Sequence, residues 1–71
     1  MTYYKLTIDF ETGTRPQATI DRMEADIEKL PADYDFVNTW GLTDVTFHHT
    51  PEEAQAELAK VLRQEKMLVN N

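Results

Sequence analysis

The chain contains no cysteine, no serine and only two glycines among its 71 residues. The missing cysteine excludes disulfide bonds and thiolate zinc sites, and the missing serine excludes a serine hydrolase. Gly13 and Gly41 stand far apart, so no glycine-rich loop is present to cradle a phosphate. These absences lead us to expect a non-catalytic protein without a cofactor or a bound metal.

Long apolar runs are also missing. No stretch approaches the roughly 20 apolar residues that cross a bilayer as a helix. The first ten residues, MTYYKLTIDF, lack the basic and apolar regions of a signal peptide, so we expect them to belong to the fold. The sequence therefore predicts a cytoplasmic protein that does not contact membranes.

Basic residues are scarce, with seven Lys and Arg against 13 Asp and Glu and a formal net charge of -6. Nucleic acids and anionic membranes are bound through clustered Lys and Arg, so we expect neither as a direct partner. An acidic protein attracts basic surfaces instead. We therefore expect a protein partner, with a basic protein as one candidate.

A chain of 71 residues is too short for two domains, so residues 1–71 form a single predicted domain. Its core is small and has neither a disulfide nor a metal to support it. A homodimer would add buried surface, and the length therefore favours self-association.

Residues 3–10 alternate between two sets of side chains, which is the pattern of a half-buried strand. The predicted inner face consists of Tyr4, Leu6, Ile8 and Phe10. The outer face consists of Tyr3, Lys5, Thr7 and Asp9.

The segment 14–30 has the features of an amphipathic helix. Its first four residues, TRPQ, resemble a capping box with proline in the first turn. An apolar stripe follows at helical spacing, and it consists of Ile20, Met23, Ile27 and Leu30. Pro31 is expected to end the helix, because the residue before a proline avoids the helical conformation.

Two further strands are predicted at 34–40 and 43–49, with a turn near Gly41. The register of 34–40 stays open, because Phe36 and Val37 are adjacent and cannot share a face. If Val37 points toward the helices, the uncovered face gains Tyr34, Phe36, Asn38 and Trp40. If Phe36 points inward, Trp40 closes the end of the core and Asn38 is buried. In 43–49, we expect Val45 and Phe47 to point inward and Asp44, Thr46 and His48 outward.

A second helix is predicted to begin at Thr50-Pro51, with Thr50 as the N-cap. Its apolar face consists of Ala54, Leu58, Val61 and Leu62. Glu65 would interrupt this face, so the helix either ends near residue 64 or extends beyond the core. Residues 66–69 are then either frayed helix or a short closing strand.

This order of elements, β-α-β-β-α with a possible last strand, predicts an α+β fold. We expect a two-layer sandwich of the ferredoxin-like, split β-α-β type, with two helices on one face of a mostly antiparallel sheet. In that arrangement the strand 43–49 lies between the other two strands. A simple meander in sequence order is the alternative.

Two helices cover only one face of such a sheet, so the other face is a candidate interaction surface. Its predicted members include Tyr3, Tyr34, Trp40 and His48. A second candidate is an acidic stripe on the first helix, formed by Asp21, Glu24 and Glu28. The leading hypothesis is a small regulatory or interaction protein acting through protein–protein contacts. One alternative is an acidic inhibitor that imitates nucleic acid in a basic groove.

The other alternative is a small-ligand or metal-binding module on the uncovered face. The two histidines, His48 and His49, are adjacent on a strand and point to opposite faces, so they do not ligate one metal easily. Asp9, Glu11 and Asp44 lie on or near the uncovered face, and we interpret them as solvated carboxylates. No residue is therefore assigned as catalytic, cofactor-binding or metal-ligating.

Overall fold

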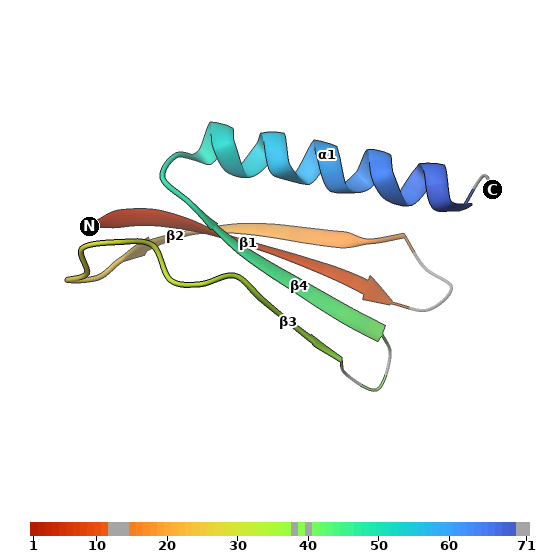
Figure 1. Cartoon of the computed structure of the whole chain (residues 1–71), viewed down its shortest axis with the longest axis horizontal. Helices are drawn as coiled ribbons and strands as arrows, with labels where there is room; N and C mark the ends of the chain where they lie inside the picture. Colours follow the sequence, from red (N-terminus) through yellow and green to blue (C-terminus); the bar gives the residue numbers. More distant parts are fainter. Residues whose placement is uncertain (12–14, 38, 40, 70–71) are drawn as a thin grey trace.

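The computed structural model describes residues 1–11, 15–37, 39 and 41–69, with side chains as far as residue 64. Four strands precede one helix. They are β1 (Thr2–Glu11), β2 (Gln17–Glu24), β3 (Tyr34–Val37) and β4 (Gly41–His48), and the helix is α1 (Pro51–Val69). The strands form one antiparallel sheet in the order β2-β1-β4-β3, and α1 lies along one face of it (Figure 1).

The two-helix, ferredoxin-like sandwich is wrong, because residues 17–24 form β2 instead of the body of a helix. β2 pairs with β1 over eight residues, and Ile20 lies opposite the fully buried Leu6. The central strand β1 thereby gains a hydrogen-bonded neighbour on its second edge. Pairing of this kind overrides a weak local helix preference, particularly at the β-branched pair Thr19 and Ile20.

The other strands pair as the hairpin pattern indicates. β3 and β4 are antiparallel neighbours, and β4 lies between β1 and β3. Gly41, the first residue of β4, lies opposite Glu11. A Cβ atom at this position would overlap the carbonyl oxygen of Phe10 and lie 2.9 Å from its carbonyl carbon. The close approach of the two backbones therefore requires glycine here.

Helix α1 begins where Thr50-Pro51 predicts. The N–H of Glu53 donates to the Thr50 hydroxyl at 3.1 Å, and the Glu53 carboxylate accepts the N–H of His49 at 3.1 Å. Of the two alternatives for its end, the helix continues past residue 64 to Val69, so an end near residue 64 and a closing strand at 66–69 are both wrong. Residues 64–68, QEKML, are all strong helix formers and favour this extension. No helix in the described residues is long and apolar enough to span a membrane.

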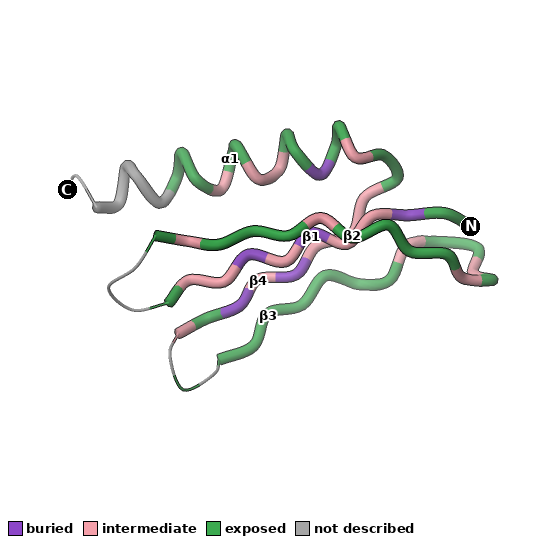
Figure 2. The backbone as a smooth tube through the Cα atoms, turned by 180° about the vertical axis from the view of Figure 1, so that it is seen from behind, coloured by how far each residue is buried: buried purple, intermediate pink, exposed green. Residues whose placement is uncertain are grey.

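The core beneath α1 contains the fully buried residues Leu6, Ile8 and Ala54. Partly buried apolar side chains surround them, namely Tyr4, Phe10, Ile20, Leu58 and Val61. The helix contacts β1, β4 and β2, but within the described residues it does not contact β3. Burial is therefore concentrated on the two central strands, while both edge strands are mostly exposed (Figure 2).

The faces of β4 are the reverse of those expected. Thr46 lies opposite Leu6 and Asp44 opposite Ile8, so the even-numbered side chains of β4 share the face of α1. Val45 and Phe47 consequently lie on the face without a helix. Alternation fixed which side chains of β4 share a face, but the register against β1 decides which face the helix covers.

Candidate interaction surface

Four aromatic side chains form a continuous row on the face opposite α1, and we call this row the aromatic surface. Its members are Tyr3, Phe47, Tyr34 and Phe36. Successive ring centroids lie 5.9, 6.2 and 6.5 Å apart, and Tyr3 meets Phe47 edge to face. Tyr3 is only 7% exposed, whereas Tyr34 and Phe36 are each 47% exposed. The row is thus buried at its β1 end and exposed to solvent at its β3 end.

The middle of this face is closely packed although no helix covers it. Val45 and Thr43 of β4 are each only 1% exposed. The strand register places Val45 between Thr7 and Tyr34, and Thr43 between Asp9 and Phe36. The Thr43 hydroxyl donates to the Asp9 carboxylate at 2.6 Å, which satisfies its hydrogen bond. The exposed rings of β3 therefore rest beside an ordered, buried layer.

Two backbone hydrogen bonds between β1 and β2 show which peptide groups of β3 point away from the sheet. Met1 and Ala25 exchange both N–H···O bonds, so odd-numbered residues of β1 bond to β2. Even-numbered residues of β1 then bond to β4, and odd-numbered residues of β4 bond to β3. Tyr34 and Phe36 therefore bond inward, while the peptide N–H and C=O groups of Asp35 and Val37 point away from the sheet.

The hydrogen bonding between β3 and β4 ends at the side chain of Asp33. The Asp33 carboxylate accepts the N–H of Phe47 at 3.2 Å, at the position where a longer β3 would have supplied a carbonyl. This bond agrees with the direction of the peptide groups derived above. It ends the pairing of β3 at Tyr34, the first of the four residues of the strand.

Carboxylates gather at the same edge, with Asp35 and Asp44 on the helix side, and we call them the acidic edge cluster. Its members are Asp33, Asp35, Asp44 and Glu57. Asp35 lies directly opposite Asp44, and Glu57 comes from α1. The pKa of Asp44 is raised, first by its burial and then by the negative charges of Asp35, Glu57 and Asp33. The edge of the sheet at β3 is therefore aromatic on one face, and its other face has Asp35 beside Asp44 and Val37 beside Leu42.

Only some of the residues predicted for the uncovered face lie together in the structure. Tyr3 and Tyr34 belong to the aromatic surface, where Phe47 joins them. His48 lies on the helix side, half-buried, and its Nε2 is hydrogen-bonded to the Thr46 hydroxyl at 2.7 Å. Trp40 lies outside the described residues, as does Asn38.

The helical acidic stripe is wrong, because its residues do not lie on a helix. Asp21 and Glu24 lie three residues apart on β2 and therefore point to opposite faces. The Glu24 carboxylate pairs with Arg22 at 2.7 Å, where both side chains are well exposed. Glu28 lies in the segment between β2 and β3. The three residues thus do not form one surface.

Sequence reasoning missed two parts of the site. Phe47 was placed in the core, although it links Tyr3 to Tyr34. The closeness of Asp35, Asp44 and Glu57 was not foreseen. The alternation of Tyr34 and Phe36 with Asp35 was a usable signal, because it already gives one aromatic and one acidic side to that strand.

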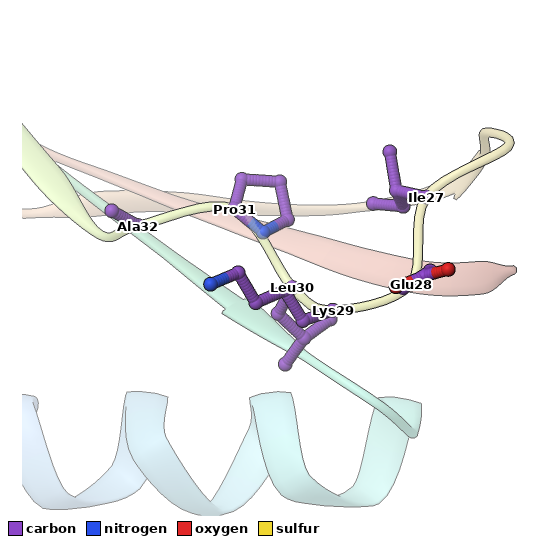
Figure 3. Close-up of a pocket in the computed structure, with 6 residues that line it drawn as sticks. All are labelled: Ile27, Glu28, Lys29, Leu30, Pro31 and Ala32. Atoms are coloured by element: carbon purple, nitrogen blue, oxygen red, sulfur yellow. The ribbon is translucent and has the colours of Figure 1, made fainter.

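The described residues also contain a hollow, but it has few polar groups. The consecutive residues 27–32 line it, and Glu28 and Lys29 are its charged members (Figure 3). No second element contributes a side chain to it. Within the described part of the chain, no group of three or more His, Asp or Glu could hold a metal ion. We therefore take the β3 edge, and not this hollow or a metal site, as the candidate functional site.

Comparison with known proteins adds no functional information: no family model, curated protein or solved structure matches the chain. The geometry of the β3 edge therefore carries the functional conclusion.

Proposed function

We propose that this protein is a small, non-catalytic interaction module that binds a protein partner through β3 and the aromatic surface. One observation carries the proposal: three of the four residues of β3 are large apolar side chains left in contact with water. Tyr34 and Phe36 are each 47% exposed and Val37 is 81% exposed. Exposed apolar residues gathered on one element are typical of protein interaction sites.

The chemistry of the surface suits protein recognition. Aromatic residues dominate the binding energy of many interfaces, because they bury a large area with few rotatable bonds. Here the rings of Tyr34 and Phe36 stack on each other, and the buried Val45 and Thr43 lie beside them on β4. Such rings are held before a partner arrives, so binding them costs little conformational entropy.

A photo-crosslinking experiment tests the proposal. A photoreactive amino acid replaces either Phe36 or Gln55, which is an exposed residue of α1, and the protein is irradiated in a native extract. We expect discrete adducts from position 36 and only diffuse background from position 55. Mass spectrometry identifies the adducts. If both positions give the same products, the proposed surface is wrong.

Sedimentation of the purified protein is the companion measurement. An adduct of twice the chain mass from position 36, with a concentration-dependent sedimentation coefficient, would identify a second copy as the partner. A monomer at all concentrations, combined with discrete adducts in the extract, would identify a different protein.

A further inference from the structure

Building on the proposed function, we propose that the β3 edge binds an extended segment of the partner as a fifth strand. We further propose that this segment alternates apolar residues with lysine or arginine. Three independent properties of the edge specify these features: the direction of its peptide groups, the aromatic surface and the acidic edge cluster.

The backbone of β3 supplies the first property. Asp35 and Val37 direct their N–H and C=O groups away from β4, and both residues are exposed. In the described part of the chain, no element lies beyond β3 in the sheet. An added strand gains main-chain hydrogen bonds from such an edge, as in other cases of strand addition.

The aromatic surface determines which residues of the added strand should be apolar. In an added antiparallel strand, the residue opposite Phe36 shares its face and extends the row that runs from Asp9 through Thr43 to Phe36. An apolar side chain there would cover the exposed half of the ring. Its neighbours two residues away along the added strand also face the aromatic surface, so they too should be apolar.

The acidic edge cluster determines where the added strand should have lysine or arginine. On the helix side, the strand register forms a row from Ile8 through Asp44 to Asp35, and the added residue opposite Asp35 continues this row. Because α1 does not contact β3, this side of the added strand stays open to long side chains. Lysine or arginine would pair with Asp35 there and reduce the repulsion between Asp35 and Asp44.

Charge argues against a second copy of this chain as the occupant. A symmetric antiparallel pair of β3 strands places Asp35 opposite either Asp35 or Val37 of the partner copy, with the helix faces on the same side. Both registers bring two acidic edge clusters onto one face. Like charges in adjacent strands disfavour pairing, and charged edges are a common protection against self-association.

The test uses a cyclic β-hairpin peptide whose outer strand alternates valine and lysine. A matched hairpin with glutamate in place of lysine is the charge control. Binding to the full chain is followed by titration in NMR spectra. We expect saturable binding of the lysine hairpin, with the largest shifts at Asp35–Val37, and no saturable binding of the glutamate hairpin.

Three variants separate the contributions. V37P removes the outward N–H without breaking a bond to β4, since proline is tolerated on the open side of an edge strand. It should weaken binding about tenfold, whereas V37T, which keeps the N–H, should change it by less than about twofold. D35N should weaken binding about threefold at low salt, with a smaller effect at high salt. Unchanged amide spectra away from β3 establish that each variant is folded.

The proposal is wrong if the lysine hairpin does not bind, if the glutamate hairpin binds equally well, or if V37P and V37T behave alike. Crosslinking from position 36 separates this failure from failure of the proposed function. Discrete adducts that persist in V37P would mean that the aromatic surface binds a partner without strand addition. Adducts of this chain with itself would identify a second copy and also overturn the inference.

Discussion

The two faces of the sheet reach the same degree of burial by different arrangements. Under α1, Leu6 and Ile8 are sealed by a second layer that includes Ala54. On the opposite face, Val45 and Thr43 are equally buried, yet no helix lies over them, and four aromatic rings lie along the face. The first arrangement covers its core with a separate element. The second protects its own core with side chains that remain half-exposed, so a single set of residues can serve both stability and binding.

The helix-covered face should give the largest loss of stability when it is truncated. L6A removes a side chain that is 0% exposed, and we expect the free energy of unfolding to fall by about 2–5 kcal/mol. Urea denaturation followed by circular dichroism measures the change. The control is L62A on α1, where the side chain is 40% exposed and the loss should be below about 1 kcal/mol. Equal losses of stability in L6A and L62A would mean that burial does not determine the contribution of these two side chains.

The aromatic face should rank second. V45A deletes two buried methyl groups and leaves a small cavity, so we expect a loss of about 2 kcal/mol. The same substitution at Val37, which is 81% exposed, should change stability by less than about 0.5 kcal/mol. If V45A is as mild as V37A, the face opposite the helix is not a second core.

The hydrogen bond on the aromatic face gives a smaller effect. T43V keeps the shape of the side chain but removes the hydroxyl that donates to Asp9, and we expect a loss of about 1 kcal/mol. Thr19 on β2 is exposed, so T19V should be nearly neutral. Thermal unfolding of both variants at pH 7 makes the comparison. A neutral T43V would show that packing alone holds this face.

The acidic edge cluster should give the smallest effect, with the opposite sign. D44N should raise the free energy of unfolding at pH 7 by about 0.2–1 kcal/mol, because it removes a carboxylate that faces Asp35. The pKa of Asp44 is raised in the fold, so the folded state binds its proton more readily than the unfolded chain does. The wild-type protein therefore recovers this stability as the pH falls through the raised pKa.

The pH dependence makes this last prediction specific. The advantage of D44N should shrink on acidification and vanish below the ordinary aspartate pKa of 3.8. D21N is the control, because Asp21 lies opposite Lys5 on the other side of the sheet and should gain nothing at pH 7. A constant advantage of D44N from pH 7 to pH 3 would show that its charge is not the cause.

Much of the fold could be predicted from local patterns. The alternation in β1, the β3–β4 hairpin and the start of α1 at Thr50 all have short-range causes. β2 could not be predicted in this way. Ile20, the one residue of β2 that is not exposed, fits a helical stripe with Met23 as well as it fits a strand. Only the pairing of β2 with β1 decides between the two, and it joins residues that lie 8 to 22 positions apart in the sequence.

The candidate site shows the same limit. The place of Tyr3 on the face without a helix follows from alternation within its own strand, whereas alternation alone left the face of Tyr34 open. The partnership of Phe47 with Tyr3, and of Asp35 with Asp44, depends on the register between strands. A shift of one residue in that register would move every side chain of β4 to the other face. Sequence patterns alone did not fix the register.

The bond from Phe47 to Asp33 has a consequence for solubility. By occupying the N–H of Phe47, the Asp33 carboxylate ends the pairing of β3 with β4 at Tyr34, and the strand of four residues is too short for extensive cross-β stacking. Asp33 thus has the properties of an aggregation gatekeeper, a charged residue placed at the end of an adhesive segment. Lengthening β3 past Asp33 to strengthen partner binding would remove this safeguard and should favour fibrils.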